Sequence, residues 1–266
     1  MDAGISLNFD RIAEQYDESR GGAERGEGIA ADLVSWLAPG AVLEVGIGTG
    51  IVAAALRARG VAVHGVDLST AMLRRAVDRL GSVVVRADAL ALPVASGSVD
   101  NVLFVSALHA IGDVPGAVAE AVRVLRARGR LVAVHGVPLR VPADDDIARA
   151  LVPLADLRDF RSDTVAVLEE EAAAGSLEPV GTAWTTGGTL AQTPSAVADS
   201  IERRLWSYLW YVDELTWQAV VAPVFAALRA LPEPNRPRQY DLSSRLVVYA
   251  RGDVTRGRDP APASRA

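Results

Sequence analysis

Residues 42–50 read VLEVGIGTG: a strand-forming run that contains the acid Glu44 leads into glycines at positions 46, 48 and 50. The apolar helix pattern IVAAALRAR follows at residues 51–59. A glycine loop between a strand and a helix lets a ligand lie against bare backbone. Such a loop can hold a phosphate, a dinucleotide or a ligand without phosphate, so the stretch predicts a binding site and leaves its ligand open.

The first half of the chain alternates strand and helix patterns with short connections. Strands are expected at residues 41–45, 61–67, 82–88, 99–106 and 129–136, and helices at residues 50–60, 69–81 and 115–129. Apolar strands that alternate with helices are typical of a parallel sheet covered on both faces. We therefore predict an α/β, doubly wound fold.

Helical patterns flank this sheet on both sides. Two amphipathic helices are expected before it, at residues 9–20 and 26–39. After it we expect helices at 142–157 and 162–175, a strand at 177–190, a helix pair at 195–231 and a closing strand at 240–252. Residues 255–266 are rich in Pro, Arg and Ala and are predicted to be a disordered tail.

The composition excludes several kinds of chemistry. The chain has no cysteine, which removes thiolate nucleophiles and sulfur-ligated zinc, and we expect no metal site. All 27 basic residues are arginine, which removes a Schiff-base lysine and the lysine of a P-loop. The net charge of −6 argues against a nucleic-acid partner. Without a signal sequence or membrane-spanning run, the chain is expected in the cytoplasm, not bound to a membrane.

The acids near the glycine loop select among the possible ligands. The dinucleotide pattern G-x-G-x-x-G needs a glycine where this chain has Ile51. Glu44 would repel a pyrophosphate but suits a ligand with an ammonium and a sulfonium group. Asp67 ends the second strand, where a carboxylate can accept both ribose hydroxyls, and Asp88 ends the third within reach of an adenine amino group. The pattern favours an adenosine site without phosphates.

Five ordered stretches resemble one family. They are FDRIAEQYDESR (9–20), VLEVGIGTG (42–50), GVDLSTAMLRRA (65–76), ADALALPVASGSVDNVLFVSALHAIGDV (87–114) and EAVRVLRARGRLV (120–132). Together they resemble the class I S-adenosylmethionine-dependent methyltransferases, in their small-molecule, ubiquinone/menaquinone-type branch. The resemblance covers residues 9–136. It implies a mostly parallel, seven-stranded Rossmann-like sheet with an antiparallel last strand, N-terminal helices and C-terminal lid helices.

The resemblance also implies the cofactor, S-adenosyl-L-methionine, and the residues that hold it. Glu44 would hold the amino group of the cofactor through water, and the glycine loop its methionine part. Asp67 would bind the ribose, and Asp88 with Ala89 the amino edge of the adenine. Tyr16 and Arg20 would close over the cofactor, although both also suit ordinary helix packing. The implied set is Tyr16, Arg20, Glu44, Gly46, Gly48, Asp67, Leu68, Met72, Asp88, Ala89 and Ser106.

The residues after the fourth strand, SALHAI (106–111), face the transferred methyl group in this fold. The Asn/Asp-Pro-Pro-aromatic turn of nucleic-acid amino-methyltransferases is absent there, so methylation of a base is not expected. His109 and His135 are candidate catalytic bases, because a histidine can take a proton near neutral pH. A structural role is the stronger alternative for both, since displacement at a sulfonium requires positioning more than a base.

Aromatic residues gather near the C-terminus. Trp206, Trp210 and Trp217 are spaced to share one face of a helix. Such a face would line a substrate pocket, with Trp206 and Trp210 as the contacting residues, or pack the lid helices onto the sheet or a second subunit.

We therefore expect one methyltransferase domain over residues 1–254. Its parts are an N-terminal cap (1–40), a cofactor-binding half (41–136), lid insertions (140–232) and the closing strand. The expected reaction is methyl transfer to a small organic molecule, with secondary metabolites as one class of acceptor, by a monomer or homodimer. Two alternatives stay open: a protein that uses the cofactor without methyl transfer, such as a cyclase or decarboxylase, and a non-catalytic partner subunit.

Overall fold

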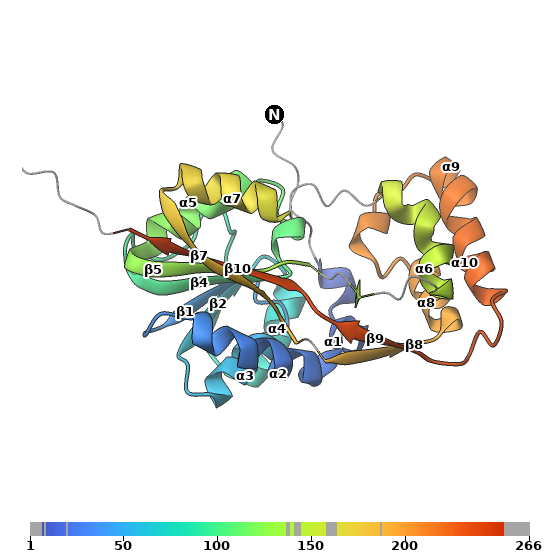
Figure 1. The fold of residues 1–266 in the computed structure, drawn as a ribbon, viewed down its shortest axis with the longest axis horizontal. Coiled ribbons are helices and arrows are strands. Elements are labelled where there is room, and N and C mark those ends of the chain that lie inside the picture. Colours follow the sequence, from blue (N-terminus) through green and yellow to red (C-terminus); the bar gives the residue numbers. More distant parts are fainter. Residues whose placement is uncertain are drawn as a thin grey trace, which may run out of the picture.

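The computed structural model describes residue 7 and residues 9–19, 21–136, 139–140, 145–157, 164–186 and 188–252. The described chain forms two adjoining parts, a large sheet between helices and a smaller helical part beside it (Figure 1). The predicted tail at residues 255–266 lies outside the described residues. None of the described helices is long and apolar enough to cross a lipid bilayer.

The large sheet has seven strands in the order β3-β2-β1-β4-β5-β10-β7. They are β1 (Val42–Val45), β2 (Val63–Asp67), β3 (Val84–Arg86), β4 (Val99–Val105), β5 (Leu125–Val134), β7 (Leu177–Trp184) and β10 (Arg245–Arg251). The first five pair in parallel, and β10 runs antiparallel to both β5 and β7. The predicted mostly parallel, seven-stranded sheet with an antiparallel last strand is confirmed.

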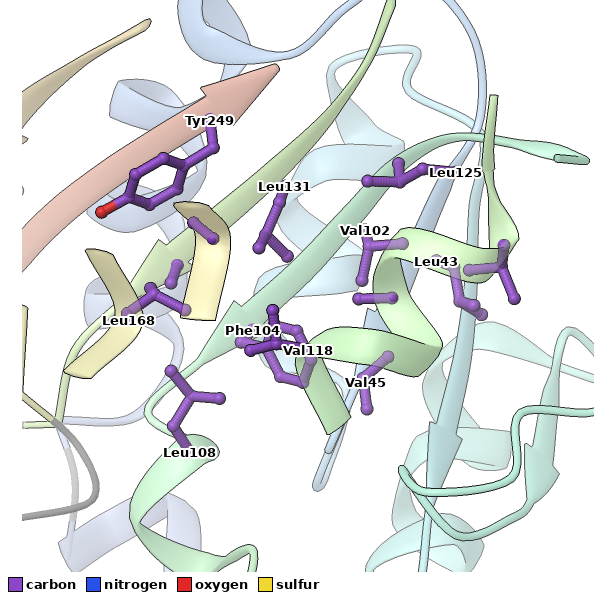
Figure 2. Packing of buried hydrophobic residues seen from close by; sticks show 14 of the residues in the cluster. Leu43, Val45, Val102, Phe104, Leu108, Val118, Leu125, Leu131, Leu168 and Tyr249 are labelled. Atoms are coloured by element: carbon purple, nitrogen blue, oxygen red, sulfur yellow. The ribbon is translucent and has the colours of Figure 1, made fainter. Parts of the chain in front are cut away.

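Helices cover both faces of this sheet (Figure 1). One face packs on α5 (Val114–Val124) and α7 (Val165–Ala174), and the other on α2 (Gly22–Leu33), α3 (Ile51–Ala58) and α4 (Thr70–Leu80). The strands alternate between the two cores: on β10, Val247 and Tyr249 join the first, whereas Leu246 and Val248 join the second. Figure 2 shows the first core, where leucines, valines and Phe104 fill the space between sheet and helices.

Local signals set the ends of α4 as expected. The Ser69 hydroxyl accepts a hydrogen bond from the backbone N–H of Met72, and Gly81 follows the last residue of the helix with φ 73°. The expected helix at 115–129, in contrast, is too long. It ends at Val124, and the buried Leu125 already pairs with Val99 as the start of β5. Arg128 then adopts φ 64°, which a continuous helix does not permit.

The N-terminal region is less regular than predicted. Residues 9–20 were expected to form one helix, but the structure has a 3₁₀-helix (Phe9–Ile12), a turn and the short helix α1 (Tyr16–Ser19). The helix expected at 26–39 starts earlier, as α2, and continues after Leu33 as a 3₁₀-helix (Val34–Trp36). Gly21 precedes α2 in the left-handed conformation, φ 89°, so the chain turns sharply between α1 and α2.

A second, three-stranded sheet corrects two strand predictions. It consists of β6 (Leu139–Arg140), β8 (Thr189–Gln192) and β9 (Arg238–Leu242) in the order β6-β9-β8. The strands expected at 177–190 and 240–252 are each interrupted where the chain passes between the two sheets. At this crossing the Thr185 N–H donates to the Ser244 carbonyl (2.9 Å), and the Ser244 N–H donates to Thr185 Oγ1 (3.0 Å).

The helical part comprises short elements around a core of its own. They are α6 (Asp146–Leu151), a 3₁₀-helix (Val152–Leu157), α8 (Pro194–Glu202), a 3₁₀-helix (Ser207–Leu209), α9 (Glu214–Thr216), a π-helix (Trp217–Val221) and α10 (Ala222–Arg229). In Figure 1 they gather beyond the three-stranded sheet, apart from α5 and α7.

The prediction that Trp206, Trp210 and Trp217 share one helix face is wrong, because no single helix carries them. The chain leaves α8 after Glu202, Arg204 adopts φ 52°, and the Trp210 indole N–H donates to the Arg204 carbonyl (2.8 Å). Trp217 packs in the core of the helical part, with the Arg204 guanidinium 3.7 Å from its ring centroid. Trp210 instead packs against the N-terminal residues.

Candidate functional site

A cavity opens at the carboxyl ends of the central strands, where an open α/β sheet binds its ligands. It encloses about 680 Å³, counting the open space at its mouth. Its lining residues are Leu7, Phe9, Tyr16, Val45, Gly46, Gly48, Val66, Asp67, Leu68, Met72, Ala87, Asp88, Ala89, Val105, Ser106, Ala107, Ala110 and Ile111. Apolar side chains dominate among the described lining residues, and of these Asp67 and Asp88 carry the charged groups.

The glycine loop forms one wall of the cavity. Gly46, Gly48 and Gly50 have φ values of 73°, 57° and 78°, a conformation that side chains with a Cβ rarely adopt. A Cβ at Gly46 would lie 2.7 Å from the Cβ of Ala107, whereas a Cβ at Gly48 would meet no atom within 4 Å. Gly46 therefore permits close packing of two strand ends, while Gly48 leaves its backbone open to a ligand.

This difference predicts unequal effects of two alanine substitutions. Gly48→Ala adds only left-handed strain, which costs about 1–2 kcal/mol. Gly46→Ala adds the same strain and an overlap with Ala107, so we expect about 1–3 kcal/mol more. Urea unfolding of the ligand-free variants measures both losses. Equal losses would mean that the loop relaxes around the new methyl group.

Asp67 ends β2 with both carboxylate oxygens already oriented. Oδ2 accepts a hydrogen bond from the Gly48 N–H and Oδ1 accepts one from the Ser69 N–H, each at 2.8 Å. Burial raises the pKa of this carboxyl, and the backbone hydrogen bonds oppose that rise. Each oxygen keeps a lone pair for another donor, which fits the predicted contact with two ribose hydroxyls.

Asp88 and its neighbours form the side of the cavity beyond β3. The Asp88 carboxylate accepts a hydrogen bond from the Leu90 N–H (3.0 Å), which fixes the turn after the strand. Leu68, Ala89 and Met72 line the same cavity. Met72 is 2% exposed and also packs against Ile12 and Trp210, so it serves both as core and as cavity wall.

Glu44 lies behind this wall and is not among the residues that line the cavity. Its side chain is 2% exposed, and within the described chain its Oε2 accepts no hydrogen bond. Burial, followed by the nearby charge of Asp67, raises its pKa from 4.5 to about 8. The side chain is therefore mostly protonated at neutral pH until a cation approaches it.

The N-terminal residues close the opposite side of the cavity. Tyr16 lines it, as predicted from the resemblance, and so do Leu7 and Phe9. The Phe9 and Tyr16 rings meet edge to face at 6.0 Å, and the Phe9 ring lies 5.1 Å from that of Trp210. The contact predicted for Arg20 concerns a residue outside those that the structure describes.

Ser106 lines the cavity at the end of β4 in an unusual backbone conformation. Its φ is 50°, which is strained for a residue with a Cβ. The buried Arg25 donates a hydrogen bond to its hydroxyl oxygen at 2.9 Å. The Ser106 hydroxyl can in turn donate to a ligand in the cavity.

The two candidate bases are placed less favourably. Neither His109 nor His135 is among the described residues that line the cavity. His109 directly precedes the lining residue Ala110, and its ring centroid is 6.4 Å from that of Phe9. His135 is 5% exposed at the end of β5. Their catalytic roles stay predictions.

Trp206 and Trp210 also stand back from the cavity wall formed by the described residues. Trp206 packs on the core of the helical part, 5.8 Å from Tyr208 between ring centroids. Trp210 supports Phe9 from behind. Their predicted contact with substrate stays a prediction.

Ala107, Ala110 and Ile111 lie in the SALHAI stretch that was expected to face the methyl group, but six other lining residues were not predicted. They are Leu7, Phe9, Val45, Val66, Ala87 and Val105. Most of these are small or apolar residues next to strand ends, where they look like ordinary core positions. Phe9 was detectable, because it lies in the FDRIAEQYDESR stretch that carries the family resemblance.

Residues 43–133 match the model of a methyltransferase domain family. This part of the chain is therefore similar to a methyltransferase domain. This match supports the predicted cofactor, S-adenosylmethionine, and it covers β1 to β5 with the glycine loop and both cavity carboxylates.

Curated relatives agree with the family match. The demethylmenaquinone methyltransferase of Thermus thermophilus is 37% identical over 142 residues, which cover 49% of this chain and 64% of that protein. The ubiquinone/menaquinone biosynthesis C-methyltransferase of Paracoccus denitrificans is 36% identical over 152 residues, covering 50% of this chain and 59% of that protein. The chain thus spans about three-fifths of the length of the curated relatives that it matches.

Solved structures extend the likeness to almost the whole fold. A phosphoethanolamine N-methyltransferase of Haemonchus contortus has a TM-score of 0.53 at 18% identity, over 91% of this chain and 57% of that one. The [4+2]-cyclase SpnF has a TM-score of 0.54 at 18% identity, over 94% and 99%. At such identities the likeness concerns the fold alone.

Proposed function

We propose that the protein transfers a methyl group from S-adenosylmethionine to a small, largely apolar organic molecule. The observation that carries this proposal is the cavity beside the glycine loop. It presents Asp67 and Asp88 from two successive strands, with the buried acid Glu44 behind it. The charges of Asp67 and Asp88 disfavour a phosphate-bearing nucleotide, and a positively charged group on a nucleoside would favour the ionised form of Glu44.

The residues around the cavity have separable tasks in this reaction. When bound, S-adenosylmethionine supplies a methyl group that its sulfonium already activates. Asp67 would hold the ribose, Asp88 and Ala89 the adenine edge, and Gly48 the methionine part against open backbone. Phe9, Tyr16 and Ile111 would exclude water from the reacting end. The protein thereby contributes positioning, and a base is needed only for an acceptor that must lose a proton.

The acceptor class follows from the lining and from the relatives. The residues of the cavity beyond the predicted cofactor contacts are mainly apolar, among them Leu7, Phe9, Ala110 and Ile111. The named relatives methylate quinone precursors, which are also apolar. Those matches cover about half of this chain, so we assign the class and not the quinone. The cytoplasmic location, the monomer or homodimer and the secondary-metabolite acceptor likewise stay predictions.

Calorimetry with the full chain tests the cofactor assignment. We expect S-adenosylmethionine and S-adenosylhomocysteine to bind at micromolar concentration, and NADH not to bind, because its pyrophosphate would face the carboxylate of Asp67. No binding of either sulfur ligand by folded protein at millimolar concentration would refute the proposal.

One alternative keeps the cofactor without the transfer. The [4+2]-cyclase SpnF shares this fold, so the fold does not require methyl transfer. Incubation with a panel of apolar acceptors separates the two functions, because methyl transfer releases one S-adenosylhomocysteine per product. Turnover without that release would identify the cofactor-dependent alternative. A partner subunit would give neither turnover nor tight binding.

A further inference from the structure

The N-terminal segment, residues 9–19, contacts the candidate cofactor site through two acids as well as through its aromatic rings. Asp10 lies on the 3₁₀-helix at its start and Asp17 lies on α1. Neither acid lines the cavity. Each instead accepts a hydrogen bond from a hydroxyl group, Asp10 from Ser69 and Asp17 from Thr49. These hydroxyls lie on or next to the residues whose N–H groups bind Asp67.

Asp10 reaches Asp67 through Ser69. Its Oδ1 accepts hydrogen bonds from the Ser69 hydroxyl (2.6 Å) and from the Ala71 N–H (2.9 Å), both at the start of α4. The Ser69 N–H donates to Asp67 Oδ1 at 2.8 Å. Asp10 therefore fixes the residue that orients one oxygen of the ribose-binding carboxylate.

Asp17 reaches the other oxygen through the glycine loop. It is 7% exposed and accepts a hydrogen bond from the Thr49 hydroxyl. Arg79 donates to both partners, to Asp17 Oδ2 and to the Thr49 carbonyl (2.6 Å). Gly48, the residue before Thr49 in the loop, donates its N–H to Asp67 Oδ2 at 2.8 Å. Asp17 thus holds the loop that orients the second oxygen.

The same segment forms the cover of the cavity through Phe9 and Tyr16. Whenever the segment is seated, both carboxylates engage α4 and the loop, and both rings lie over the ligand space. If it detached, the hydroxyls of Ser69 and Thr49 would lose their acceptors. Small displacements of groups that support a binding residue weaken the ligand contacts which that residue makes.

We propose that Asp10 and Asp17 are positioning residues. Their hydrogen bonds to Ser69 and Thr49 hold the N-terminal segment against the two backbone stretches whose N–H groups orient Asp67, and we call this pair of contacts the clasp. Docking of the N-terminal segment, with Phe9 and Tyr16 over the cavity, and orientation of the Asp67 carboxylate then occur together. This inference rests on the proposed function for its ligand. The contacts on which it stands are all internal to the protein.

A cycle of variants and ligands tests the proposal. Asp10→Ala and Asp17→Ala are compared with Glu14→Ala, which removes an exposed acid from the same segment. Calorimetry measures the Kd of S-adenosylhomocysteine and of its 2′-deoxy analogue. We expect each clasp variant to lose about 3- to 30-fold in affinity for the ribose ligand. The loss should be clearly smaller for the analogue, because a contact of Asp67 is then already missing.

The outcomes separate this inference from the proposed function. Losses equal to that of Glu14→Ala, or equal for both ligands, would overturn the clasp while leaving cofactor binding intact. If the wild-type protein binds neither ligand, the proposed function fails. Amide hydrogen exchange of the ligand-free protein then tests the clasp by itself. Faster exchange at Gly48 in Asp17→Ala and at Ser69 in Asp10→Ala would support it. Unchanged exchange at both positions would overturn it. Asp17→Asn replaces Asp17→Ala if the latter does not fold.

Discussion

Replacing Asp67 with alanine is expected to weaken binding of S-adenosylhomocysteine by about 10- to 150-fold. Hydrogen bonds to a charged group contribute about 1.5–3 kcal/mol, and Asp67 is placed to accept them from the ribose. The substitution also removes the acceptor of the Gly48 and Ser69 N–H groups, so the glycine loop loses its anchor to β2. Calorimetry at fixed pH and salt measures the loss.

Two matched variants show whether this loss belongs to the site. Asp67→Asn keeps the shape and one acceptor oxygen, so we expect an intermediate affinity. Asp78→Ala removes an exposed acid from α4, the helix that follows Asp67, and should leave the Kd within twofold. Wild-type affinity in Asp67→Ala would show that the ribose lies elsewhere, and the cofactor placement would have to be withdrawn.

The position of Asp67 could be predicted because every determinant is local. The apolar run before it forms a buried strand, the carboxyl ends of parallel strands meet at one edge, and Ser69 starts the next helix two residues later. The same holds for the glycine loop and Asp88. Nine of the residues named for the cofactor line one cavity. All of them except Tyr16 lie in the glycine loop, at or after a strand end or at the start of α4, so local determinants bring them together.

The clasp and the aromatic cluster could not be predicted in this way. Asp17 and Thr49 lie 32 residues apart, and Asp10 and Ser69 lie 59 apart. Such contacts depend on how the N-terminal segment folds back onto the glycine loop and α4. The sequence predicted one helix for this segment, whereas the structure has two short helices with a turn between them. The prediction for the tryptophans failed for a related reason. Their spacing implies one face only on a continuous helix, whereas the chain between Trp206 and Trp217 forms a 3₁₀-helix, a turn and the short α9.

Glu44 predicts how stability depends on pH. Its pKa in the folded, ligand-free protein is about 8, against 4.5 for the ordinary side chain, because it is buried and close to Asp67. Between these values the unfolded chain releases a proton that the folded protein keeps. The contribution of Glu44 to stability is therefore fully present below pH 4.5 and is lost as the pH rises to about 8.

At about 1.4 kcal/mol per pKa unit, this loss amounts to several kcal/mol across the interval. Glu44→Gln keeps the shape but cannot ionise, so its free energy of unfolding should lack this decline. Urea unfolding of both proteins from pH 5 to 8.5, without ligand, gives the difference curve. A flat difference would mean that water or a backbone donor already stabilises the carboxylate.

The same carboxyl should couple cofactor binding to proton release. An ammonium group near Glu44 favours its charged form, so at pH 7 binding must remove a proton from the side chain. Affinity for S-adenosylhomocysteine should therefore rise with pH, by up to about tenfold per unit below pH 8, and level off above it. Calorimetry in two buffers of different ionisation enthalpy counts the protons released. Glu44→Gln should bind more weakly and release fewer protons, and equal release from both proteins would place the cofactor's amino group away from β1.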